Sequence, residues 1–437
     1  MRAFYVCLIG LLCCSRSGFA QEKPIAFAGA HVIPIVGPEL DNGAVVVHNG
    51  KIVAVGPAES VTIPPDAERR DCAGKTIMPG LVDTHSHLGG PWAADGSSPI
   101  QPDVRAMDSV NVRDSGFQKA QAGGITTANI MSGSGHLLSG QTVYVKLRDG
   151  KTIDDLLIKS PDGSAAGGVK MANGTNSIRS GGTGPFPGTR AKSAALVREQ
   201  FTKAQEYRDK IKRANGDAAK LPPRDLGLEV LIDIMDGKRV VHHHTHRHDD
   251  ILTVLRMSKE FGFKVVLHHV SEAWKVAPQI AEAKAPCSVI VIDSPGGKPE
   301  AKDLSMETGK ILDEAGVLVG FHSDDPITDS RLFLRSAAIS VRAGMKRDKA
   351  LYAMTMAGAI MLDMQKQVGS LEAGKDADLV ILSGDPLSVY TKVLETYVDG
   401  AKVFDRSNET DRLMATGGYG AGRDQTLFTE CCLGDGR

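Results

Sequence analysis

The strongest constraint on the fold is an alternation of short β-rich apolar runs with helix-length amphipathic stretches over residues 76–365. Eight runs have the composition of buried strands: TIMPGLVDTHSH, GITTANIM, TVYVKL, GVKMA, RVVHHH, KVVLHH, SVIVID and VLVGFHSD. Such alternation is typical of parallel strands joined by crossover helices. Eight units predict an α/β fold, the (β/α)8 TIM barrel, whose active site lies at the carboxyl ends of the strands.

Both ends of the chain carry strand-like runs of another kind, broken by Gly, Pro and Asn. Examples are AFAGAHVIPI and KIVAVGP near the start, and GSLEAGKDADLVILSGDP and VLETYVDGAKVF near the end. We expect segments 21–75 and 366–408 to form one small non-contiguous β-sandwich domain beside the barrel. Segment 409–437 has no periodic pattern and is expected to be an irregular tail.

The first 20 residues, MRAFYVCLIGLLCCSRSGFA, have the organisation of a signal peptide. A basic start precedes an apolar run, and small residues flank Phe19 near the expected cleavage site. The apolar run is shorter than the ~20 residues that a stable membrane span needs. We therefore expect an exported protein, periplasmic or extracellular, with no stable membrane span.

The charge balance excludes one class of partner. The chain has 51 Lys and Arg against 52 Asp and Glu, with no sustained basic block. A nucleic-acid-binding surface needs such a block to follow the phosphate backbone. Nucleic acid is therefore not an expected partner.

Histidines gather where the predicted strands end. His85 and His87 in DTHSH are two residues apart, so they point the same way from a strand. The fifth and sixth runs end in histidines, and the eighth ends in HSDD with Asp324. Imidazoles and a carboxylate at one face are the ligands that a divalent metal such as zinc prefers.

Strand alternation limits which of the neighbouring histidines can face the barrel interior. If His244 points inward, His243 faces outward. If His269 points inward together with Leu267, then His268 faces the surrounding helices.

The sequence resembles the amidohydrolase superfamily, and within it the imidazolonepropionase-related metal-dependent hydrolases. PGLVDTHSHL is similar to the opening signature of that family, and GSLEAGKDADLVIL is similar to its return to the small sheet domain. The resemblance implies that His85 and His87 bind one metal, that His244 and His269 are ligands from the fifth and sixth strands, and that Asp324 is the eighth-strand acid. By analogy with these relatives we also expect a homo-oligomer.

Lys170 lies in the fourth run, where binuclear members of this family have a lysine that CO2 converts to a bridging carbamate. An ammonium group cannot ligate a metal. Lys170 is therefore either carboxylated, in which case the chain holds two metals, or a solvated lysine at a strand end beside one metal. Some relatives carry a Glu soon after the lysine, where this chain has Thr175.

These residues predict a hydrolase that needs no organic cofactor. A bound metal lowers the pKa of water from ~15.7 towards ~7. Asp324 can take the proton of the attacking water and pass it to a leaving amine. We expect hydrolysis of a C–N bond in a small amide, cyclic amide or dipeptide-like substrate.

The choice of substrate depends on one position. Deaminases and imidazolonepropionase carry a Glu a few residues after the fifth-strand histidine, and this chain has Arg247 there. That difference disfavours a ring hydrolase of the deaminase or imidazolonepropionase type, which remains the alternative. The second functional hypothesis is not an enzyme: it is a non-catalytic metal- or ligand-binding protein.

Several further residues are candidates for contact with the substrate. Arg247 either binds a substrate carboxylate through its planar donors or is held by Asp249 or Asp250. His246 is expected to bind the substrate carbonyl, and His136, in a Gly-rich stretch, to line the pocket. Further candidates near the eighth run are His322, Asp325 and Arg331.

Overall fold

A computed structural model describes residues 23–91, 95–179, 184–292 and 299–417. The predicted signal peptide lies outside the described residues, as does most of the predicted tail. Among the described residues, we found no helix with the length and apolarity needed to cross a bilayer.

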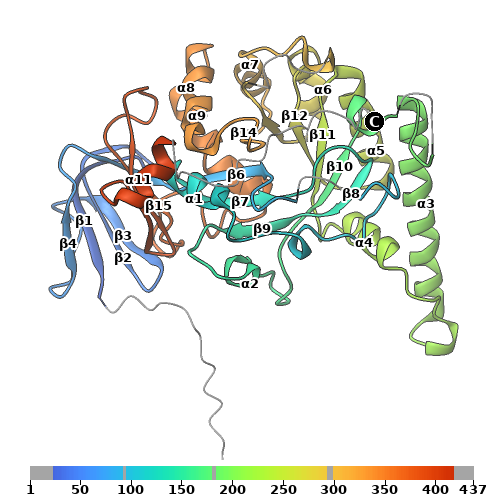
Figure 1. Ribbon diagram of the computed structural model, residues 1–437, viewed down its shortest axis with the longest axis horizontal. Coiled ribbons are helices and arrows are strands. Elements are labelled where there is room, and N and C mark those ends of the chain that lie inside the picture. Colours follow the sequence, from blue (N-terminus) through green and yellow to red (C-terminus); the bar gives the residue numbers. More distant parts are fainter. Residues whose placement is uncertain (1–22, 92–94, 180–183, 293–298, 418–437) are drawn as a thin grey trace, which may run out of the picture.

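The strands of the described residues fall into three sheets, and two of them make up the central part of the molecule (Figure 1). In one of these, six strands follow the order β14-β13-β12-β11-β10-β8, and β10 to β14 are parallel. The other has the order β6-β7-β9, in which β6 and β7 are parallel. Their bounds are β6 (Leu81–Ser86), β7 (Ile125–Ile130), β8 (Leu138–Gln141), β9 (Val143–Lys146), β10 (Val169–Ala172), β11 (Val241–Thr245), β12 (Val265–His269), β13 (Cys287–Val289) and β14 (Val319–Phe321).

The two central sheets are connected at both edges. At one edge, the Asp324 amide donates to the His85 carbonyl over 2.9 Å, and Ser86 pairs with Asp325 in a parallel bridge. At the other edge, β8 and β9 follow each other with only Thr142 between them. β8 pairs with β10, and β9 pairs with β7. The mixed α/β character of the prediction is confirmed.

The run TVYVKL, predicted as a third parallel strand, is β9, and it runs antiparallel to β7. A parallel connection needs a crossover of a dozen or more residues, usually a helix. The chain between β7 and β9 instead contains a loop and β8, and no helix. The chain therefore returns alongside β7 in the opposite direction.

Helices cover the central strands on the outside (Figure 1). Their bounds are α1 (Ser115–Ala122), α2 (Ile153–Leu156), α3 (Arg190–Ala214), α4 (Leu226–Met235), α5 (His248–Phe261), α6 (Ala277–Glu282), α7 (Thr308–Glu314), α8 (Leu334–Arg342), α9 (Arg347–Ala353), α10 (Met356–Met361) and α11 (Glu409–Thr416). Residues 409–416 were expected to be irregular. They form α11 because the Asn408 side chain caps it by accepting from the Thr410 and Asp411 amides.

Helix α5 shows how the sequence sets these elements. Its apolar residues recur at helical spacing, so one face is buried against the strands. Asp249 and Asp250 lie in the first turn, where the helix dipole favours negative charge. The helix ends at Gly262, whose φ of 74° is the left-handed conformation typical of a helix terminus.

The third sheet takes strands from both ends of the chain. Its order is β17-β16-β15-β5-β1-β2-β3, and β4 pairs with β1. The bounds are β1 (Ile25–Val32), β2 (Leu40–His48), β3 (Lys51–Pro57), β4 (Glu68–Asp71), β5 (Thr76–Pro79), β15 (Leu379–Leu382), β16 (Val393–Val398) and β17 (Ala401–Asp405). The two chain ends meet where β5 and β15 pair antiparallel. These strands form one sheet of eight.

The first predicted run, TIMPGLVDTHSH, is divided between two sheets. β5 belongs to the eight-stranded sheet and β6 to the central part. Gly80 separates them, and a Cβ there would come within 2.2 Å of the Thr126 side chain. The chain can therefore pass between the two sheets at this point because glycine has no side chain.

A buried ion cluster attaches β9 to the eight-stranded sheet. The Lys146 side chain is 1% exposed, and its Nζ lies 2.8 Å from Asp376, 2.7 Å from Asp378 and 3.2 Å from Asp399. Burial alone would lower the pKa of Lys146, but the three carboxylates outweigh burial and raise it. The ammonium charge is therefore part of this junction.

We expect Lys146→Met to destabilise the protein by about 3–5 kcal/mol, because it leaves buried carboxylates without their cation. Urea unfolding followed by circular dichroism measures the change. Lys203→Met is the matched control, since Lys203 pairs with Glu199 on the surface and both side chains are about half exposed. Equal unfolding midpoints for the two variants would show that the Lys146 cluster does not stabilise the junction.

Candidate metal centre and active site

The first group of candidate ligands joins β6 to the end of β14. His85 and His87 are fully buried. The Asp324 Oδ1 lies 3.3 Å from the His85 Nε2 and 3.0 Å from the His87 Nε2. One ligand atom from each residue lies within 4.8 Å of the others, so the three can hold one metal ion. The structure therefore brings together residues that the sequence placed on the first and eighth strands.

A second group lies beside the first. His244, His246 and His269 are buried, and one ring nitrogen from each lies within 4.8 Å of the others. The His269 Nδ1 is 3.8 Å from the Asp324 Oδ2, so Asp324 lies next to both groups. Predicted ligands from β11 and β12 thus meet those from β6 and β14.

Lys170, on β10, reaches the first group. Its Nζ lies 3.0 Å from the His85 Nε2, and the residue is 1% exposed. The alternative of a solvated lysine at the strand end is therefore wrong. Lys170 therefore lies beside the first group of candidate ligands.

The charge states of these residues fit a divalent metal. Burial, followed by the nearby Lys170, lowers the pKa of His85, and burial, followed by His244, lowers that of His269. Burial alone would raise the pKa of Asp324, but the hydrogen bond with His87 is the largest of the contributions that outweigh burial and lower it. Neutral imidazoles and an ionised carboxylate are the forms in which these residues bind metal.

Two observations on ring nitrogens support this fit. Among the described residues, the buried His269 Nε2 has no hydrogen-bond partner. The His87 Nδ1 donates to the Met131 carbonyl over 2.7 Å, which orients the ring so that its Nε2 faces Asp324.

His268 was expected to face the surrounding helices, and that prediction was wrong. Its Nε2 lies 3.0 Å from the His242 Nδ1, and its ring centroid lies 5.0 Å from that of His85. In the β11–β12 register, His268 pairs with His244 and Leu267 pairs with His243. His268 therefore shares the inward face with His244, and Leu267 points outward.

His269 also reaches the interior because its backbone leaves the strand conformation. Its φ is 67°, and that of Val270 is 49°. Strand alternation alone would turn His269 outward, and the left-handed backbone brings it back to the metal centre. Both histidines of the LHH run are therefore inside.

His322, predicted only as a further candidate near the eighth run, lies within the cluster. Its Nε2 lies 3.1 Å from the His269 Nδ1, and its Nδ1 lies 2.8 Å from the Ser288 hydroxyl. It precedes Asp324 by two residues, and that spacing was the available signal. His85, His268 and His322 form a third group with ligand spacing.

Asp83 was missed by sequence analysis. It is buried and accepts from the Ser323 amide over 3.0 Å and from the His85 amide over 3.2 Å. Burial raises the pKa of Asp83 to about 7. Asp83 fixes the backbone of His85 against the end of β14, and its place in DTHSH was the signal.

The structure places the two expected substrate contacts, His246 and Arg247, in different surroundings. The His246 Nδ1 pairs with the Ser271 hydroxyl over 2.7 Å, and its ring stacks on His269, so it belongs to the second group. Arg247 lies beside Asp249, with Nε–Oδ1 and Nη2–Oδ2 distances of 3.0 and 2.9 Å, which favours the alternative that Asp249 holds it.

The three remaining candidates are His136, Asp325 and Arg331, and each contacts a nearby side chain or backbone group. The His136 ring is buried and packs edge-on to Phe186 with centroids 5.1 Å apart. Asp325 accepts from the Ser330 amide over 2.9 Å, and Arg331 pairs with Asp329.

Comparisons with known proteins define the class. The amidohydrolase family model matches residues 299–410. A solved amidohydrolase from Thermotoga maritima is 34% identical, covers 87% of this chain and 100% of its own, and superposes with a TM-score of 0.80. The chain belongs to the amidohydrolase superfamily.

Two curated relatives extend this assignment. The amidohydrolase tasK of Hapsidospora irregularis is 29% identical over 83% of this chain, and the match spans 40% of that protein. An imidazolonepropionase of Rhizobium rhizogenes is 26% identical over 80% of this chain and 89% of its own length. These relatives bear out the resemblance that the sequence motifs indicated.

We expect the purified protein to contain about two divalent metal ions per chain and Lys170→Ala to contain about one or none, since one side chain would complete both groups. Metal analysis by mass spectrometry, with protein concentration measured in parallel, gives the stoichiometry. His248→Ala is the control, because His248 pairs with Glu272 outside the cluster and should leave the metal content unchanged. One metal in both wild type and Lys170→Ala would contradict the binuclear site.

Proposed function

We propose that this chain is a metal-dependent amidohydrolase that cleaves the C–N bond of a small amide, cyclic amide or dipeptide-like substrate. The observation that carries the proposal is the buried Asp324 carboxylate, 3.3 Å from the His85 ring and 3.0 Å from that of His87. Membership of the superfamily supports it. No organic cofactor is required.

We propose that the two central sheets correspond to a (β/α)8 barrel and that the eight-stranded sheet belongs to a small β-sandwich domain. The backbone bond between Asp324 and His85 supports closure of the barrel, since it joins β6 to the segment after β14. The proposed ligands then lie at the carboxyl ends of the strands, as in other barrel enzymes.

The residues that would hold the metal are His85, His87, Lys170, His244, His269 and Asp324. A divalent metal, with zinc as the proposed ion, supplies water of lowered pKa and polarises the scissile carbonyl. Asp324 is ionised, so it accepts a proton from the attacking water. It then returns this proton to the nitrogen that leaves.

Lys170 would take part as a carbamate. Its neutral amine attacks CO2, an N–C bond forms and a proton is released, which gives a carboxylate on the side chain. Its position beside the His85 Nε2 supports this assignment, because the carbamate would then lie next to a proposed metal ligand. An unmodified ammonium at the same place would repel a cation.

An amide is favoured over a ring substrate by the residues after β11 and β12. Arg247 takes the place of the expected Glu and is held by Asp249. The first carboxylate after β12 belongs to Glu272. It lies 2.6 Å from the His248 ring and 3.1 Å from the Lys275 ammonium. That carboxylate is therefore occupied rather than poised to move protons on a ring nitrogen. The relative named imidazolonepropionase keeps ring hydrolysis as the second candidate.

Substrate binding, location and assembly complete the proposal. His246, inside the second group, would bind the substrate carbonyl, while His136 would contact a more distant part of the substrate. The enzyme would act after export as a homo-oligomer. The signal-peptide features of residues 1–20 support export.

We expect wild-type protein to hydrolyse at least one member of a panel of N-acyl amino acids, lactams and dipeptides, including Xaa-Pro dipeptides. Asp324→Asn should lower kcat by about 10²–10⁴-fold, because the variant cannot carry the proton. Release of amine, measured by derivatisation and chromatography, reports turnover. Asp249→Asn makes the same change at a half-exposed position and should keep near wild-type activity.

The same assay separates the alternatives. Turnover of imidazolonepropionate or aminopurines with none of the amide panel would favour a ring hydrolase. Full metal occupancy without turnover of any compound, and ligand binding unaffected by Asp324→Asn, would favour a non-catalytic binding protein.

A further inference from the structure

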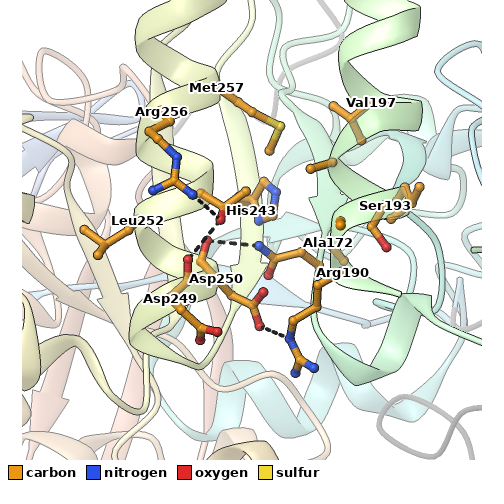
Figure 2. A pocket seen from close by; sticks show the side chains of 15 residues that line it. Ala172, Arg190, Ser193, Val197, His243, Asp249, Asp250, Leu252, Arg256 and Met257 are labelled. Carbon is orange, nitrogen blue, oxygen red and sulfur yellow. Dashed lines mark hydrogen bonds and ion pairs between the residues drawn. The ribbon is translucent and has the colours of Figure 1, made fainter. Parts of the chain in front are cut away.

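A cavity of about 440 Å³ lies on the outer side of β11, between α3 and α5 (Figure 2). His243 lies at its back, which confirms that His243 faces outward from the barrel strands. His244, its neighbour on β11, points the other way into the second ligand group. The cavity is therefore separated from the metal centre by the strand itself.

The walls of this cavity are mainly apolar. Val197 from α3 faces Met257 from α5 (Figure 2), and Ala194 extends the α3 wall. Leu252 of α5 also lines the cavity. A volume of this size and walls of this kind are typical of small-molecule sites. The body of a ligand here would be apolar.

Among the described residues, one cation at the cavity has no acidic partner. Arg190 pairs with Asp250 over 2.8 Å and with Glu300 over 3.3 Å. In contrast, Arg256 is exposed and donates to the Thr253 hydroxyl over 2.8 Å, and no carboxylate pairs with it within the part of the chain that the structure describes. The guanidinium of Arg256 is thus available to an anion, and carboxylates fit its planar donors.

The back of the cavity offers a polar atom. The His243 Nδ1 donates to the His244 carbonyl over 2.9 Å. The other ring nitrogen can pair with a hydroxyl, which both donates and accepts.

We propose that this cavity is a second ligand site, distinct from the metal centre, which binds a small amphipathic carboxylate. The carboxylate would pair with Arg256, and the apolar body would pack between α3 and α5. A terminal hydroxyl would reach His243. This inference does not depend on the proposed hydrolytic activity.

Titration calorimetry with metal-loaded protein and 4-hydroxyphenylacetate tests the site. We expect one saturable binding site in the wild type. Arg256→Gln should weaken binding about tenfold or more, since it removes a charge-assisted pair. Ala194→Trp should abolish binding by filling the cavity. Tyramine, which replaces the carboxylate with an ammonium group, should not bind.

Binding of equal strength to wild type, Arg256→Gln and Ala194→Trp would overturn the proposal, because the probe would then lie elsewhere, for example on the metal. Failure of the wild type to bind, or tyramine binding as tightly as the acid, would also overturn it. Circular dichroism and melting temperature verify that the variants fold. Ala191→Trp, from the same wall, replaces Ala194→Trp if that variant does not.

Discussion

The contact of the Asp324 carboxylate with the imidazoles of His85 and His87 is the interaction on which the site depends. An ionised carboxylate without water is costly unless it is paired and hydrogen-bonded. His85 lies on β6 and His87 directly follows this strand, so the pairing holds β6 and the segment after β14 together. Asp83 strengthens the same junction by accepting from Ser323 and from the His85 backbone. The proposed metal chemistry and the meeting of the strands therefore depend on the same residues.

The strands could be predicted because buried β-rich runs are recognisable from composition, and each of the eight predicted runs contains a strand. The direction of β9 could not, because it depends on whether the chain crosses over before returning. The division of TIMPGLVDTHSH also escaped prediction. It depends on the close approach of Thr126 to Gly80, which is a contact between segments far apart in sequence.

The predicted ligands were brought together for reasons that were only partly visible in the sequence. The spacing of His85 and His87 and their place at a strand end were sufficient, because alternation holds there. Alternation failed at His268, since the inference assumed that His269 continues the strand. Two left-handed residues, His269 and Val270, turn one more histidine into the centre. Periodicity does not reveal such a residue unless it is a glycine.

The histidine-rich run of β11 is explained by the two faces of one strand and the helix that follows. His244 and His246 belong to the metal centre, His243 belongs to the outer cavity, and His248 begins α5 and pairs with Glu272. The His244 carbonyl accepts both from the His243 ring and from the Asn173 amide, which follows β10. The backbone of a proposed ligand is thus fixed from the cavity side as well as from the neighbouring strand. β11 separates the candidate metal centre from the outer cavity. The many histidines of this run therefore do not form one cluster, because they lie on opposite faces of the strand and at the start of α5.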